Sequence, residues 1–257
     1  MSINSYLCDL AGELILSSAE KDHVATSLEA IKNNLNLYFG NEIIEKKVFG
    51  SYDRGTILPR KVDENSDIDL MLVFNNSYGY KPQSFLNRLK SFAEHYYSRS
   101  EIYQSSPTIV LELHHIKFEL TPAYRFCGSY YIPNGQSFWM QTDPDGFSGT
   151  LVQCNINNGS KIKPVARLLK HWNIQNNSRK IASFELEKTI ANDLMYAYFS
   201  LSTYTDYVKA GLEKIKFKTD YSKVNTAINH INQAIAYENR KMVYSAIAEI
   251  QKVFPEI

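Results

Sequence analysis

Two aspartates separated by one residue, Asp67 and Asp69, are the side chains of this sequence best placed for chemistry. They begin a run of eight residues, Asp-Ile-Asp-Leu-Met-Leu-Val-Phe, whose apolar character predicts a central strand covered on both faces. Side chains two apart on a strand share a face, so both carboxylates point the same way. Two like charges at the end of a buried strand need a counter-cation, and hard oxygen ligands suit Mg²⁺ or Mn²⁺. The spacing therefore predicts a divalent metal site.

A glycine-serine pair, Gly50-Ser51, precedes the aspartates and follows a short apolar run. The glycine allows close approach of the backbone, and the pair offers an amide and a hydroxyl that suit phosphate oxygens. Each motif alone is also explained by a plain turn, either a hairpin at Gly-Ser or a strand entry at Asp-Ile-Asp. Their order and their flanking apolar strands favour a phosphate cradle that faces a dicarboxylate metal site.

The elements that must position these residues follow from hydrophobic periodicity. Apolar residues at helical spacing predict one amphipathic helix over residues 18–39. Short apolar runs separated by turn residues predict strands at 48–49, 68–74 and 108–113. A helix at about 83–97 is expected to cover one face of the resulting sheet.

The second half of the chain changes character twice. Residues 124–160 have weak periodicity and turn-forming Pro and Gly, which indicates irregular connecting structure. Helical spacing returns from Lys163 to the end. We therefore expect two domains: residues 1–160 with the sheet and the N-terminal helix, and residues 161–257 as a helical lobe.

Composition excludes several classes of protein. The chain has 257 residues with 28 basic and 27 acidic side chains, so a net charge of +1 offers no global reason to bind long nucleic acid. Cys8, Cys127 and Cys154 lack the spacing of a disulfide framework or a structural zinc site, which favours a reducing cytoplasm. No apolar run approaches the roughly 20 residues of a membrane helix, and the first ten residues lack signal-peptide features, which disfavours insertion and secretion.

The motif Gly50-Ser51, followed by Asp67-Ile-Asp69 at the start of a hydrophobic strand, resembles the nucleotidyltransferase core of the DNA polymerase β-like superfamily. The form in this chain is similar to the cGAS/DncV-like nucleotidyltransferases (CD-NTases), bacterial enzymes of anti-phage signalling related to oligoadenylate synthases. The resemblance spans roughly residues 31–199. It implies an α+β fold with a mixed twisted sheet and flanking helices, a C-terminal helical lobe, and a central cleft between the two lobes.

The resemblance also implies a third carboxylate on a neighbouring strand, and Glu119 is the candidate. The family residue is usually Asp, so Glu119 is longer by one methylene. Glu112, in the adjacent apolar run, is the rival, although it lacks the Pro-Ala that follows the third carboxylate in the family. A solvent-facing strand glutamate is the plain alternative for Glu119.

By the same resemblance, Lys170 and Ser183 bind the donor triphosphate. The residues agree with this role, because Ser183 is expected at a helix N-cap, where free amides and the helix dipole receive an anion. The plain alternatives are simple capping by Ser183 and a lysine that extends along the helix surface into solvent. Phe184 takes the place of an aromatic on which these enzymes stack the donor base, with core packing as its alternative.

The implied reaction joins nucleoside triphosphates into a cyclic or linear oligonucleotide second messenger with release of pyrophosphate. Asp67, Asp69 and Glu119 would hold two Mg²⁺ or Mn²⁺ ions. A downstream effector protein that reads the product is the expected partner, with no membrane or long nucleic acid involved. Two other functions stay open: an antitoxin-like enzyme that adenylylates a protein hydroxyl, and a non-catalytic nucleotide-binding partner of an effector.

Overall fold

The computed structural model describes residues 1–257, and its contacts divide the chain into two compact units. The sheet unit comprises Ser17–Arg54 and Asn65–Gly146. The helical unit comprises Met1–Leu16, Gly55–Glu64 and Phe147–Ile257. This division differs from the predicted boundary at residue 160, because the helices α1 (Ile3–Glu13) and α5 (Gly146–Asn157) bury side chains such as Leu7 and Leu151 in the helical core.

The sheet unit contains a seven-stranded mixed sheet with the path β1-β2-β5-β4-β3, extended by β6 on β5 and β7 on β6. Only β2 and β5 pair in parallel. The strands are β1 (Ile43–Phe49), β2 (Asp67–Phe74), β3 (Glu101–Ser105), β4 (Thr108–Glu112), β5 (Lys117–Phe126), β6 (Ser129–Asn134) and β7 (Phe138–Thr142). The helices are α2 (Ser18–Phe39), η1 (Gly40–Glu42), the short α3 (Gly50–Asp53) and α4 (Pro82–Tyr96).

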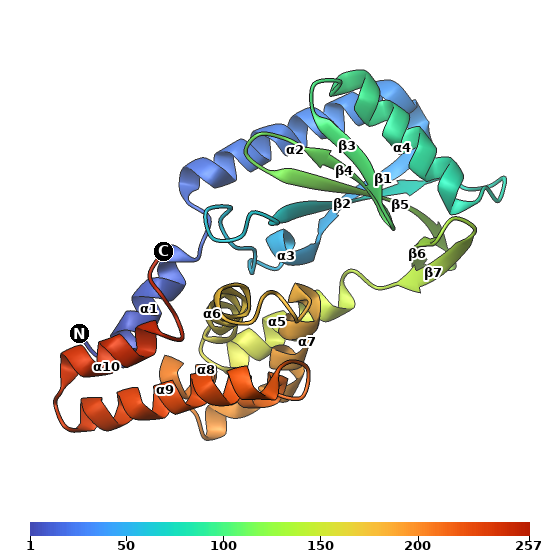
Figure 1. Cartoon of the computed structure of the whole chain (residues 1–257). Coiled ribbons are helices and arrows are strands. Elements are labelled where there is room, and N and C mark those ends of the chain that lie inside the picture. Colours follow the sequence, from blue (N-terminus) through green and yellow to red (C-terminus); the bar gives the residue numbers. More distant parts are fainter. The chain divides into compact units, whose positions relative to one another are not determined.

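The two long helices α2 and α4 cover one face of this sheet (Figure 1). The ring of Phe74 on β2 packs against Phe39 of α2 and Phe85 of α4, with centroids 5.3 and 4.7 Å away. Residues of β2 that alternate with Phe74 along the strand therefore point to the opposite face. That opposite face carries Asp67 and Asp69.

The helix predicted over residues 18–39 is confirmed with the same bounds. A capping box explains its start, because the Ser17 side chain accepts from the Glu20 amide and the Glu20 side chain accepts from the Ser17 amide. The predicted central strand is confirmed as β2, which lies between β1 and β5 and is buried continuously from Leu70 to Phe74. The helix expected at about 83–97 is confirmed as α4.

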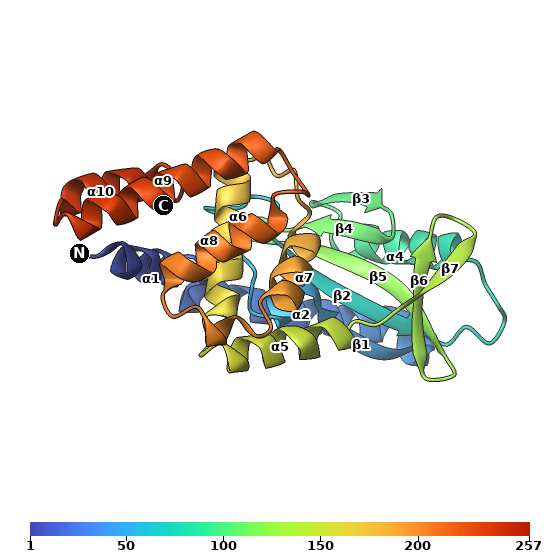
Figure 2. The ribbon, with the colours of Figure 1, turned by 90° about the horizontal axis from the view of Figure 1, so that it is seen from below.

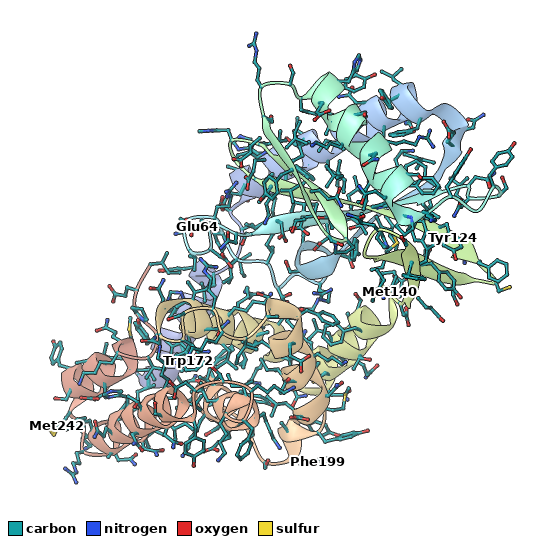
Figure 3. All side chains as sticks on the ribbon, turned by 45° about the vertical axis from the view of Figure 1, so that its right-hand side comes forward. Glu64, Tyr124, Met140, Trp172, Phe199 and Met242 are labelled. Carbon is teal, nitrogen blue, oxygen red and sulfur yellow. The ribbon has the colours of Figure 1, made fainter.

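The prediction of irregular structure over residues 124–160 is wrong. The end of β5, the hairpin of β6 and β7, and the helix α5 together occupy most of it. Aromatic contacts hold the hairpin to β5, since Tyr124 stacks on Tyr131 at 5.1 Å and meets Trp139 edge-on at 4.9 Å. Figure 3 labels Tyr124 at this end of the sheet unit and Met140 on β7. The turn residues of this segment thus connect strands.

The helical unit is built around α6, which α7 and α8 pack against (Figure 2). Trp172 of α6, labelled in Figure 3, is 1% exposed and belongs to the core of this unit. The remaining elements are α6 (Ile162–Gln175), α7 (Ser183–Asp193), η2 (Ala197–Phe199), α8 (Tyr204–Ile215), α9 (Tyr221–Asn239) and α10 (Val243–Gln251). None of the helices combines the length and apolar character that a membrane span requires.

Candidate active site

Three carboxylates of the sheet unit share one face through the parallel pairing of β2 and β5. The register places Asp69 beside Glu119 and Asp67 beside Lys117. Residues in register on adjacent strands point to the same face. Asp67, Asp69 and Glu119 therefore lie together, on the face opposite the helices α2 and α4, as the sequence predicted for the two aspartates.

Gly50 follows β1 at the level of Asp69, because the last residue of that strand, Phe49, pairs with Asp69. Its φ angle is +74°, in the left-handed region that favours glycine. A Cβ atom at this position would lie 1.7 Å from Asp69 Oδ2. The backbone of Gly50 therefore lies close to the Asp69 carboxylate, as a glycine allows. This carboxylate occupies the space that a larger side chain at position 50 would fill.

Burial and neighbouring carboxylates disfavour the ionised forms of Asp69 and Glu119. Burial and the charges of Asp67 and Glu119 raise the pKa of Asp69 to about 8, although Arg54 and Lys117 act in the other direction. Burial, followed by the charge of Asp67, also raises the pKa of Glu119. A carboxyl group whose pKa is raised by neighbouring anions gains from a bound cation.

Lys117 is the local cation that the sequence reasoning did not assign to the site. Its Nζ lies 3.3 Å from Asp67 Oδ2 and 3.5 Å from Glu119 Oε1. Burial acts to lower the pKa of Lys117, but the two carboxylates outweigh it and the net shift is upward. The signal was present in the sequence, because Lys117 is two residues before Glu119 on the same strand face.

The donor set fits a divalent cation in its chemistry, because it consists of three carboxylates and the pKa of one of them, Asp69, is strongly raised. In this structure no three His, Cys, Asp or Glu side chains are grouped so that they could hold a metal ion. The Lys117 ammonium between Asp67 and Glu119 supplies part of the positive charge instead.

The rival carboxylate, Glu112, ends β4 and pairs with Lys117. Val110 of the same strand pairs with Glu119. Glu119 has Asp69 as its direct neighbour across β2 and β5, whereas Glu112 has no register partner on β2. The geometry thus favours Glu119 over Glu112 as the third carboxylate.

Comparison with known families supports the same interpretation. The model of the Second Messenger Oligonucleotide or Dinucleotide Synthetase domain matches residues 1–155. The chain belongs to this synthetase family. The match covers more than half of the chain and includes the Gly50-Ser51 motif and all three carboxylates. The predicted resemblance to CD-NTases is confirmed.

Individual relatives of this chain are distant in sequence. A cyclic AMP-AMP-AMP synthase of Acinetobacter is 20% identical over 206 residues, which is 76% of this chain but 60% of that protein. Among solved structures, CdnC of E. coli MS115-1 in complex with HORMA-deltaN has a TM-score of 0.71 at 14% identity. The match covers 98% of this chain and 96% of the CdnC chain. The CD-NTase CdnG of Bradyrhizobium diazoefficiens, in complex with GTP, reaches 0.72 at 11% identity, with coverage of 97% and 98%. These likenesses confirm the predicted α+β fold.

The helical unit carries Lys170, and the alternative of a lysine extended into solvent is wrong. Lys170 is 4% exposed and forms an ion pair with Glu187 of α7. Its Nζ also donates to the Thr56 carbonyl at 3.0 Å. The sequence reasoning did not single out Glu187 or Thr56.

Ser183 and Phe184 begin α7 in the same unit. Ser183 is the first helical residue and Ala182 is the N-cap, so the expected N-cap position is off by one residue. No side chain caps this helix start, and Ser183 is exposed. Phe184 is 50% exposed, and its ring meets that of Phe147 edge-on at 5.1 Å.

Proposed function

We propose that this protein is a metal-dependent nucleotidyltransferase that joins nucleoside triphosphates into a cyclic or linear oligonucleotide second messenger. One observation carries the proposal: Asp67, Asp69 and Glu119 share one face of the sheet beside Gly50, in a chain of the synthetase family. The cyclic AMP-AMP-AMP synthase activity of the Acinetobacter relative supports a trinucleotide or dinucleotide product.

The proposed cofactors are two divalent cations, Mg²⁺ or Mn²⁺, held by Asp67, Asp69 and Glu119. When bound, such ions supply positive charge that stabilises the attacking oxygen and the departing pyrophosphate. The three carboxylates provide hard oxygen ligands and must be ionised to do so. Lys117 balances part of their charge in the free protein.

The proposed transfer is an in-line displacement at the α-phosphate of a donor nucleotide. An acceptor hydroxyl oxygen forms the new bond to phosphorus, its proton leaves to solvent, and the bond to pyrophosphate breaks. Gly50 and Ser51 of the sheet unit are proposed to bind phosphate oxygens. Within the helical unit, Lys170 and Ser183 are proposed as ligands of the triphosphate, and Phe184 as a contact of the base. Ser183 supports this assignment, because the exposed first turn of the 11-residue helix α7 presents amides without helical partners.

The proposed setting is the bacterial cytoplasm, where an effector protein would read the product in an anti-phage response. The three cysteines, Cys8, Cys127 and Cys154, are all free thiols, which agrees with a reducing compartment. HORMA-deltaN is found in complex with the similar CdnC of E. coli, and a regulatory partner of that kind is a further proposal for this chain.

The deciding experiment incubates the protein with each NTP and dNTP, alone and mixed, with Mg²⁺ or Mn²⁺. Pyrophosphate release is measured, and mass spectrometry examines both the small molecules and the protein. A metal-dependent oligonucleotide that disappears in the Asp69→Asn variant supports the proposal. A nucleotide monophosphate added to the protein or to a second protein indicates an adenylyltransferase instead. Nucleotide binding without any product indicates a non-catalytic partner.

A further inference from the structure

A buried ion pair within the helical unit holds the lysine that the proposed function assigns to the triphosphate. Glu187 of α7 is 0% exposed and pairs with the Lys170 ammonium of α6. The Glu187 Oε1 atom also accepts a hydrogen bond from Thr56 Oγ1 at 2.8 Å. Charged groups this deeply buried persist only when they are paired and hydrogen-bonded. The three side chains therefore form one connected network.

The network joins three separate parts of the helical unit. Thr56 belongs to the segment Gly55–Glu64, which follows the Gly50-Ser51 motif closely in the chain. Lys170 lies in α6, and Glu187 lies four residues after Ser183, one turn into α7. A shift of Glu187 would therefore move both the lysine and the helix start that carries Ser183.

A second cation of α6 strengthens the same junction. Arg167, three residues before Lys170, donates from Nη1 to the Gly55 carbonyl at 2.9 Å. Lys170 donates to the next carbonyl along the chain, that of Thr56, at 3.0 Å. Arg167 is 6% exposed and Lys170 is 4% exposed, so both side chains are largely enclosed by the protein. The consecutive carbonyls of Gly55 and Thr56 thus accept hydrogen bonds from two cations on the same helix, α6.

We propose that Glu187 and Thr56 are positioning residues that fix the Lys170 ammonium and the first turn of α7 for triphosphate binding. The inference rests on the proposed function, which assigns Lys170 and Ser183 to the triphosphate. A lysine has a flexible four-carbon stem, and ordering it on binding reduces affinity. A buried carboxylate that orders it beforehand removes that loss.

The first test compares two variants that keep the shape of the side chain. Glu187→Gln removes the negative charge, and Thr56→Val removes the hydroxyl. Both are expected to raise the nucleotide KM and Kd roughly ten- to a hundredfold, the range for a hydrogen bond to a charged group. Thr56→Ser restores the hydroxyl and should recover most of the affinity. Glu213→Gln is the control, because Glu213 of α8 lies in the same unit, outside the network, and pairs with Lys216 three residues later.

The measurements are KM and kcat for pyrophosphate release, nucleotide Kd by calorimetry, and melting temperature without nucleotide. A merely structural role for Glu187 predicts a lower melting temperature with unchanged KM and Kd in the folded variant. That result overturns the inference. The inference is also overturned if Thr56→Ser binds nucleotide no more tightly than Thr56→Val.

A double substitution keeps the test available if Glu187→Gln does not fold. Lys170→Met and Glu187→Met together replace the ion pair by apolar side chains, a change that buried pairs often tolerate. If Glu187 acts through Lys170, the double variant loses no more nucleotide affinity than Lys170→Met alone. Losses that multiply would show that the two residues act independently and would refute the inference.

Failure of this inference differs from failure of the proposed function. If the wild-type protein releases no pyrophosphate from any nucleotide with either metal, the proposed function is wrong. If the wild-type protein is active and Glu187→Gln shows wild-type KM, only the positioning role is wrong.

Discussion

Replacing Gly50 by alanine tests the geometry of the carboxylate site directly. The added Cβ would lie 1.7 Å from Asp69 Oδ2, whereas such contacts below 3.0 Å are essentially never observed. The Asp69 carboxylate must therefore move by ~1 Å or more, a misplacement that can cost about a hundredfold in rate. At about 1.4 kcal/mol per tenfold, this corresponds to ~2.7 kcal/mol in the barrier.

A second effect of the same substitution acts on stability and needs its own control. Alanine at a left-handed φ of +74° costs roughly 1–2 kcal/mol in backbone strain. Gly135, between β6 and β7, has a φ of +73° and nothing within 4 Å of a built Cβ. Gly135→Ala therefore introduces the same strain without contacting a carboxylate.

The assay measures pyrophosphate release at saturating Mg²⁺ and the melting temperature of both variants. We expect similar decreases in melting temperature, and a loss of about a hundredfold in rate for Gly50→Ala only. Equal rates in the two variants, whether both are retained or both are lost, would refute the reasoning that Gly50 makes room for Asp69.

Three further expectations concern single residues. Asp67→Asn and Asp69→Asn should each abolish metal-dependent pyrophosphate release. The melting temperature without metal should stay unchanged or rise, because repulsion between like charges is relieved. A wild-type rate in either variant would show that the substituted aspartate does not belong to the site. Glu119→Gln should lose more than about a hundredfold in rate and Glu119→Asp should keep measurable activity, whereas wild-type turnover in the Gln variant would make Glu112 the next residue to test. Burial lowers the pKa of His171, whose Nε2 lies 3.0 Å from the Pro255 carbonyl and whose Nδ1 has no partner. The folded state therefore favours neutral His171, so its contribution to the free energy of unfolding is complete above the ordinary pKa of about 6.5 and is lost as the pH falls below it. Melting temperatures from about pH 8 to about pH 5 should show this fall in the wild type and a flatter curve in His171→Gln; identical curves would contradict it.

Local patterns in the sequence were sufficient for the elements closest to the carboxylates. The alternation of Asp67 and Asp69 with apolar residues defined the strand and its faces, and the helix over residues 18–39 followed from hydrophobic periodicity alone. These features depend on neighbours within a few positions, which the sequence displays directly. The Gly-Ser motif and the family resemblance then supplied the chemistry.

Segments whose conformation depends on distant partners were predicted poorly. The strands β6 and β7 pair through backbone hydrogen bonds, which composition does not reveal, so residues 124–160 gave no strong pattern. The helix α1 went unassigned, although Ile3, Leu7 and Leu10 have helical spacing, and its burial against α6 and α8 places it with the helical unit.

The sequence by itself determined the family and the strand that carries the aspartates, and it limited the candidates for the third carboxylate to Glu119 and its rival Glu112. Only the tertiary structure decided which charges meet: Lys117 with Asp67 and Glu119, and Lys170 with Glu187. The physical reason is that the hydrophobic periodicity of a sequence predicts helices and strands but does not indicate which charged residues pair. The partner of a charged residue is chosen by strand register and helix packing, which bring together residues far apart in the chain, and burial then makes that pairing obligatory.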